Sequence, residues 1–144
     1  MKVSKNFDNL TKKNSPKSPL WKDLLIAFLV GGAICTIGQM ILNLLKNAGY
    51  DKVDASALTS AILIFLSMLF TGLGLYEKLA KYAGAGTLVP ITGFANAIAA
   101  PAVEFKTEGL VLGIGAKMFV IAGPVIVYGI VSSVIAGILY YIFR

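Results

Sequence analysis

Long apolar runs separated by short polar stretches set the pattern of this chain. Residues 24–45 and 58–76 are each long enough to cross a bilayer core of about 30 Å as a helix that rises about 1.5 Å per residue. Between them, residues 46–54 are polar and suit a short loop. Tyr50 and Tyr76 flank the second run, where aromatic side chains commonly anchor a span at the membrane interface. The first half of the chain therefore predicts two conventional membrane spans.

Prolines interrupt the apolar pattern of the second half. Pro90 and Pro101 lie within residues 83–105, and each lacks the backbone N–H that a helix interior uses, so this segment is predicted not to form one uninterrupted helix. The next apolar run, residues 109–143, is too long for one span without strong tilt or a break. Pro124 is the predicted position of that break.

These boundaries predict a broken helical hairpin over residues 83–123, folded back at residues 104–108, and a final span over residues 124–143. If the hairpin enters and leaves on one side of the membrane, the chain makes three full crossings and its two ends lie on opposite sides. If both arms of the hairpin cross, the chain makes four crossings, and the sequence leaves both arrangements open. The predicted fold class is an all-α polytopic membrane bundle with two conventional spans, a Gly/Pro-broken, re-entrant helical hairpin and a carboxyl-terminal span.

Composition supports a membrane protein. Hydrophobic residues make up 57% of the chain and charged residues only 14%. The mean hydropathy of +0.80 lies outside the range usual for soluble domains. We therefore predict that residues 21–144 form a single membrane domain.

Positive charge is concentrated at the amino terminus. The net charge is +6, and six of the 13 basic residues lie in the first 22 positions beside a single aspartate. Residues 1–20 are predicted to form a disordered, Lys-rich tail, and the lysine excess places this tail in the cytoplasm. Because the rest of the chain is nearly neutral, no nucleic-acid-binding surface is indicated. The tail could serve only as a topology signal, or could also bind anionic lipid or a cytosolic partner.

Residues that commonly carry catalysis are scarce. The chain has no histidine, and Cys35 is its only cysteine. These counts exclude a zinc site of His and Cys ligands, an intrachain disulfide and the usual histidine general base. We predict that the protein is not an enzyme and that it uses no metal or cofactor.

Charges within the apolar second half are candidates for a transport pathway. An unpaired charge at the bilayer centre costs about 2.5–3.5 kcal/mol on insertion scales. Glu104 and Lys117 could pair with each other, Glu104 could lie in a wet turn, and Lys117 could extend to the interface. An amine near a half-helix amino terminus would suit a solute that carries a carboxylate. The candidate pathway residues are Pro90, Asn96, Pro101, Glu104, Glu108 and Lys117.

Other polar and small residues are candidates for helix packing. Gln39 and Asn43 lie one turn apart on the first span, and we predict that they form interhelical hydrogen bonds. Small residues spaced by four can let helices approach closely, either within one chain or in a homo-oligomer. These residues are Gly109 and Gly113, followed by Gly129, Ser133 and Gly137.

Four strings together resemble the SpoVA membrane proteins of spore-forming bacteria. They are residues 27–39 (AFLVGGAICTIGQ), 82–86 (YAGAG), 89–96 (VPITGFAN) and 108–113 (EGLVLG). The resemblance covers roughly residues 20–143, and the combination is specific where any single string would be weak. The lysine-rich tail, Asn96 and the last string favour the AC type over the related AE type.

This resemblance implies a subunit of a complex in the forespore and spore inner membrane. It implies movement of dipicolinic acid, alone or as its calcium chelate, into the forespore and its release in germination. It also implies partnership with other SpoVA proteins and a role as a channel or channel component. An alternative is a nonconducting scaffold subunit that assembles the other SpoVA proteins.

Overall fold

The computed structural model describes residues 19–143, and every regular element in that range is a helix. The tail predicted at residues 1–20 lies almost wholly outside the described residues, as does Arg144. The all-helical class predicted from the sequence is confirmed. Three helices are long and apolar enough to cross a membrane: Leu20–Asn47, Lys52–Gly72 and Leu110–Phe143.

The first two spans form α2 (Leu20–Asn47) and α3 (Lys52–Gly72). The start of α3 was predicted to be loop, but Asp51 caps the helix by accepting a hydrogen bond from the Asp54 N–H at 2.9 Å. α3 ends at Gly72, four residues before the predicted boundary at residue 76. Gly74 follows in the left-handed conformation, at φ 69°, which glycine adopts readily.

The helix break of the second half comes before Pro90. Following α4 (Leu75–Ala83), a 3₁₀ turn covers Gly84–Thr87, and residues 88–89 belong to no helix. Pro90 is the first residue of α5 (Pro90–Glu104), where its missing N–H would have had no helical partner. This break confirms that residues 83–105 do not form one uninterrupted helix, but the interruption does not lie at Pro101. The helix continues past it, and the Phe105 N–H donates to the Pro101 carbonyl at 2.9 Å.

The prediction of a break at Pro124 is wrong. After a turn at Lys106–Glu108 and a π-helical turn at Leu110–Gly115, α6 runs from Ala116 to Phe143 with Pro124 inside it. The last span therefore begins near Leu110 instead of residue 124. A proline within a helix forfeits one hydrogen bond, whereas ending the helix in hydrocarbon would expose several backbone groups.

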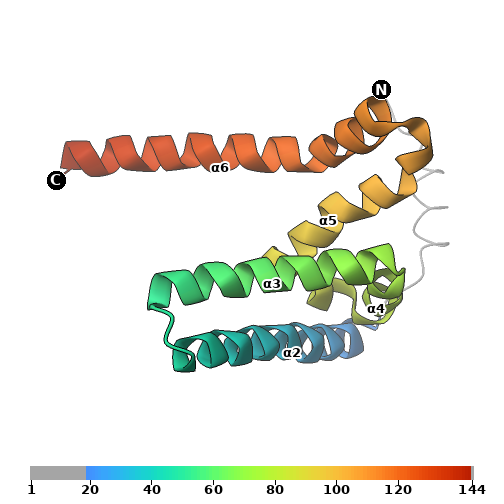
Figure 1. Ribbon diagram of the computed structural model, residues 1–144, viewed down its shortest axis with the longest axis horizontal. Coiled ribbons are helices and arrows are strands. Elements are labelled where there is room, and N and C mark those ends of the chain that lie inside the picture. The colour runs from blue at the N-terminus through green and yellow to red at the C-terminus, as the bar shows by residue number, and fades with distance from the viewer. Residues whose placement is uncertain (1–18, 144) are drawn as a thin grey trace, which may run out of the picture.

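The spans define two sides of the molecule. The α4 side holds the start of α2, the end of α3 and α4, and the loop side holds residues 48–51 (Figure 1). Two hydrogen-bonded contacts join Ser67 to Thr92 and Thr71 to Asn96, so α5 runs parallel to α3 and also ends on the α4 side. The 15 residues of α5 measure about 22 Å, too short for a crossing of about 30 Å.

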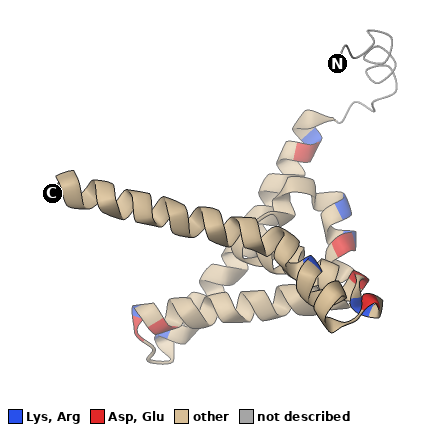
Figure 2. Ribbon diagram, turned by 90° about the horizontal axis from the view of Figure 1, so that it is seen from above, with Lys and Arg blue, Asp and Glu red and all other residues tan. Residues whose placement is uncertain are grey.

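This arrangement of three long apolar helices and one short helix matches the re-entrant alternative of the sequence analysis. We call residues 84–104 the re-entrant segment, because it enters and leaves on the α4 side before α6 crosses to the loop side (Figure 1). Its deepest part is the stretch before Pro90, whereas the hairpin prediction had set the fold-back at residues 104–108. That turn instead lies on the α4 side, and charged residues gather at the helix ends in Figure 2.

Packing is uneven along the chain. The most extensive helix contact joins α3 and α5, and the 3₁₀ turn packs against α2. On α6, every described residue from Pro124 to Phe143 is exposed. In a bilayer, lipid or a partner helix covers such a surface.

Candidate functional site

Buried polar groups gather where the re-entrant segment is deepest. Ser67 is 2% exposed, Thr87 4% and Thr92 7%, and the ring of Tyr76 is also buried. The Ser67 hydroxyl donates to the Thr92 carbonyl at 2.6 Å. The Tyr76 hydroxyl donates to the Thr87 carbonyl at 2.7 Å. Ser67 of α3 and Tyr76 of α4 thus bond to the backbone on either side of the non-helical residues 88–89.

The third support comes from the backbone of α2. Gly86 lies so close to α2 that a Cβ there would be 2.6 Å from the Ala27 carbonyl oxygen, and a Cβ on Gly31 would in turn meet the Gly86 oxygen at 3.4 Å. Only glycine fits at position 86. Ala27 and Gly31 are about 10 and 16 Å along α2 from its start, so the re-entrant segment meets α2 well inside this apolar helix.

Backbone donors at this depth lack partners. Among the residues that the structure describes, no acceptor receives the N–H of Val89, Ile91 or Thr92, and the first hydrogen bond into α5 runs from the Gly93 N–H to the Val89 carbonyl. An unpaired backbone group costs several kcal/mol in hydrocarbon, and non-helical backbone at such depth is tolerated beside protein or water. The arrangement can therefore present N–H groups to water or to a polar solute.

A second polar contact lies one turn further along α3 and α5. The Thr71 hydroxyl is 2.7 Å from the Ser67 carbonyl oxygen and 2.8 Å from the Asn96 Oδ1. A hydroxyl has one proton to give, so both contacts are satisfied when Thr71 donates to Ser67 and the Asn96 amide is turned to donate its N–H. Asn96 is thereby positioned by α3.

Two of the predicted pathway residues share a cavity. Asn96 and Glu104 line a cavity of about 590 Å³ on the α4 side, which we call the Glu104 cavity. It also contains Thr71 and Glu77, so its walls offer carboxylate, amide and hydroxyl groups. The remaining lining residues are Gly72, Gly74, Ala80, Ala100 and Val103.

The other predicted pathway residues lie apart from this cavity. Pro90 lines a separate apolar cavity of about 610 Å³ that reaches Met118. Glu108 is exposed in the turn before α6. The Lys117 Nζ stands 4.2 Å from the centroid of the Phe105 ring, a cation–π contact, and residues 19–143 show no ion pair between Lys117 and Glu104.

Gln39 and Asn43 bond to each other. The Gln39 Nε2 donates to the Asn43 Oδ1 at 2.9 Å along the exposed face of α2, in place of the predicted interhelical bonds. Of the small residues, Gly113 is buried against Phe105 and Glu108, whereas a Cβ at Gly129 or Gly137 would meet nothing within 4 Å.

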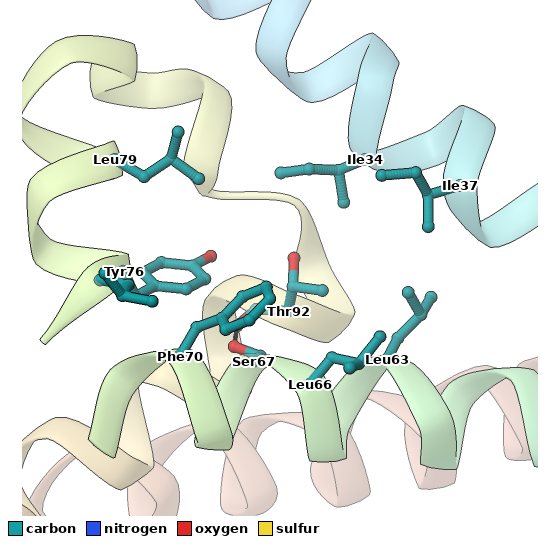
Figure 3. Close-up of a pocket in the computed structure, with 10 residues that line it drawn as sticks. Ile34, Ile37, Leu63, Leu66, Ser67, Phe70, Tyr76, Leu79 and Thr92 are labelled. Carbon is teal, nitrogen blue, oxygen red and sulfur yellow. Dashed lines mark hydrogen bonds between the residues drawn. The ribbon is translucent and has the colours of Figure 1, made fainter. Parts of the chain in front are cut away.

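Two further cavities flank the deepest residues of the re-entrant segment. The α4 cavity, of about 350 Å³, lies between α2, α3 and α4 (Figure 3), and the Cys35 cavity, of about 270 Å³, lies toward the loop side. The α4 cavity is lined by Ile34, Ile37, Leu63, Leu66, Ser67, Phe70, Leu75, Tyr76, Leu79 and Thr92. The Cys35 cavity is lined by Ile34, Cys35, Gly38, Gln39, Leu42, Ser56, Thr59, Leu63, Val89 and Ile91.

Sequence reasoning missed the residues that hold the site. Tyr76 was predicted to be an interface anchor, but its ring is buried and its hydroxyl serves Thr87, so that prediction is wrong. A signal was present, because Ser67 and Thr71 are four apart on one face of α3 and match the spacing of Thr92 and Asn96 on α5. In residues 19–143, no group of three or more His, Cys, Asp or Glu side chains could hold a metal ion.

Comparisons with known proteins cover nearly the whole chain. The family model described as SpoVAC/SpoVAEB sporulation membrane protein matches residues 23–139. The chain is 43% identical to stage V sporulation protein AC of Bacillus subtilis (strain 168) over 143 residues, which are 99% of this chain and 95% of that protein. No solved structure matches the chain. The family match includes the whole re-entrant segment.

Proposed function

The chain belongs to the SpoVAC/SpoVAEB family of sporulation membrane proteins, and on that premise we propose that it is a transport subunit of a spore membrane complex. Its solute is dipicolinic acid, alone or as its calcium chelate, which enters the forespore during sporulation and leaves during germination. Its partners are the other SpoVA proteins, and its site of action is the forespore and spore inner membrane. Its amino terminus is cytoplasmic, in keeping with the lysine-rich tail.

The observation that carries this proposal is the set of unpaired backbone donors at the start of α5. The N–H groups of Val89, Ile91 and Thr92 lack partners within the described residues, at the amino end of a half-helix deep in the membrane. Half-helix amino termini present positive potential and bind anionic solutes in transporters. Dipicolinate, a small aromatic dicarboxylate, suits such donors.

The proposed path runs past these donors between α2, α3 and α5. On the loop side it includes the Cys35 cavity, and on the α4 side it includes Asn96 and Glu104. Pro90 fixes where α5 begins, Pro101 lies on its last turns, and Glu108 and Lys117 stand near the mouth on the α4 side. Two glutamates in the Glu104 cavity favour the neutral calcium chelate over the free dianion at that mouth.

The competing function is a nonconducting scaffold for other SpoVA proteins. The uncovered surface of α6 favours it, because a helix exposed from Pro124 to Phe143 offers a large area to partners. The two functions differ in whether the re-entrant segment of this chain meets the solute.

Dipicolinate flux through the reconstituted complex separates the two functions. The complex is purified with this chain and its SpoVA partners, placed in liposomes loaded with calcium dipicolinate, and compared with complexes that carry Asn96→Leu or Glu104→Gln. We expect both variants to assemble and to change the flux severalfold, whereas Asn43→Leu, on the exposed face of α2, leaves it unchanged. Equal flux from all assembled complexes would favour the scaffold.

A further inference from the structure

Two residues line both cavities that flank the deepest part of the re-entrant segment. Ile34 of α2 and Leu63 of α3 belong to the α4 cavity and also to the Cys35 cavity. A residue that lines two neighbouring cavities stands between them. These two side chains, with the backbone of residues 89–92 beside them, therefore divide the interior between α2 and α3.

Leu63 lies at the contact between α2 and α3. Leu63 is 9% exposed, the most buried large aliphatic side chain among the described residues, and Ile34 is half-buried. Figure 3 shows Ile37 pointing from α2 toward Leu63 on α3, and Ile34 reaching from α2 into the space between α2 and α4. Leu63 rests on α2 where Gly38 leaves room, since a Cβ at position 38 would be 3.3 Å from the Leu63 Cδ1.

The two cavities differ in chemistry. The Cys35 cavity contains Gln39, Ser56 and Thr59, which can hold water. The α4 cavity also contains three polar residues, Ser67, Tyr76 and Thr92, but its other seven lining residues are aliphatic or aromatic, among them Leu66 and Phe70. Water that reaches the Cys35 cavity from the loop side thus meets an apolar barrier before the α4 side.

We propose that Ile34 and Leu63 form a hydrophobic constriction that closes the route from the Cys35 cavity to the α4 side by way of the α4 cavity. The inference rests on the proposed function for the identity of the solute, but the existence of the barrier is a separate matter. Narrow apolar constrictions block ions and polar solutes because they exclude water. A polar side chain at either position lowers the cost of hydrating the constriction and joins the two cavities.

Cys35 supplies a reporter for this barrier, because it is the only cysteine of the chain and lies on the loop side of the partition. The full chain is produced with its partners in sealed membrane vesicles of both orientations. A charged methanethiosulfonate reagent is added from outside, and the rate of Cys35 modification is measured by mass spectrometry. Vesicles that expose the α4 side test the barrier.

In wild type, we expect Cys35 to react faster from the loop side than from the α4 side. Leu63→Asn is expected to raise the rate from the α4 side about tenfold or more. The matched control is Ile62→Asn, the neighbouring residue on α3, which lines neither the α4 cavity nor the Cys35 cavity and should leave the rate unchanged. Ile34→Asn tests the same barrier from α2 if the Leu63 variant fails to fold.

The inference is overturned if a folded Leu63→Asn or Ile34→Asn protein reacts no faster from the α4 side than wild type. It is also overturned if Ile62→Asn opens access equally. Neither result depends on dipicolinate. An opened barrier in a complex whose wild type moves no dipicolinate would defeat the proposed function and leave the constriction standing.

Discussion

α3 and α6 are both long apolar helices, yet they stand in opposite surroundings. In its most apolar stretch, α3 has 22% of its residues buried, against 6% for the span Leu110–Phe143 that contains α6. Ser67 and Thr71 of α3 bond to α5, whereas the Ser133 hydroxyl of α6 bonds within its own helix to the Gly129 carbonyl. Apolarity does not itself bring helices together in lipid, so small and polar residues at matching positions determine which helices pack.

The prolines show the same contrast between packed and exposed helices. Pro124 lies in α6 without ending it, whereas the chain leaves its helix at residues 88–89, where Tyr76 and Ser67 serve the flanking carbonyls. A helix in lipid can end where neighbouring protein groups or water form hydrogen bonds with its free backbone groups. The helix is therefore interrupted where polar side chains of other helices bond to its backbone, and not wherever a proline occurs.

The largest effect is expected from filling the contact between the re-entrant segment and α2. Gly86→Val would drive its Cβ against the Ala27 backbone, which cannot yield as a flexible side chain would, and overpacking of this kind costs about 1–3 kcal/mol or more. The loss of stability is measured by heating the protein in detergent and determining the folded fraction at each temperature by size-exclusion chromatography.

The matched control for that substitution is Gly129→Val on α6, where a Cβ meets nothing within 4 Å. We expect its stability to stay within about 0.5 kcal/mol of wild type. Equal destabilisation by both variants would break the comparison, because it would mean that α6 is packed as tightly as the re-entrant segment.

A smaller effect is expected from the polar contacts. Ser67→Ala removes the donor to the Thr92 carbonyl, and interhelical hydrogen bonds in membrane proteins contribute about 0.6 kcal/mol on average and at most about 1.7 kcal/mol. Ser133→Ala removes a hydroxyl bonded within its own helix and should change stability less. Reversible unfolding in mixed micelles can rank the two, and a larger loss for Ser133→Ala would contradict the account.

The smallest effect is expected from the prolines inside helices. Pro101→Ala and Pro124→Ala each restore one backbone donor, which stabilises the helix, but each also raises the entropy of the unfolded chain, so we expect the stability to stay within about 1 kcal/mol of wild type. Circular dichroism melting of both variants measures this. A large loss of helix or of stability in either would indicate that the proline shapes a bend on which packing depends.

The sequence predicted the helical membrane class and the first two spans because apolar runs of spanning length report burial in lipid directly. It predicted an interruption within residues 83–105, but it did not show that this lies before Pro90 and that Pro101 and Pro124 stay inside helices, because the missing N–H of each proline was weighed without the backbone around it. Nor did it find the roles of Tyr76 and Gly86, since each depends on a contact with a different helix. The separation of Lys117 from Glu104 has the same cause, because Phe105 comes to lie beneath the amine only in the folded turn.

The central claim is that residues 84–104 enter and leave on one side of the membrane, and the side on which Lys106 lies tests it most directly. In a Cys35→Ser background, single cysteines at Lys106 and Asp51 are labelled with a membrane-impermeant maleimide in sealed vesicles of known orientation. We predict that Lys106→Cys is labelled from the side of the amino terminus and Asp51→Cys from the opposite side. Labelling of both cysteines from the same side would make α5 part of a full crossing and contradict the account.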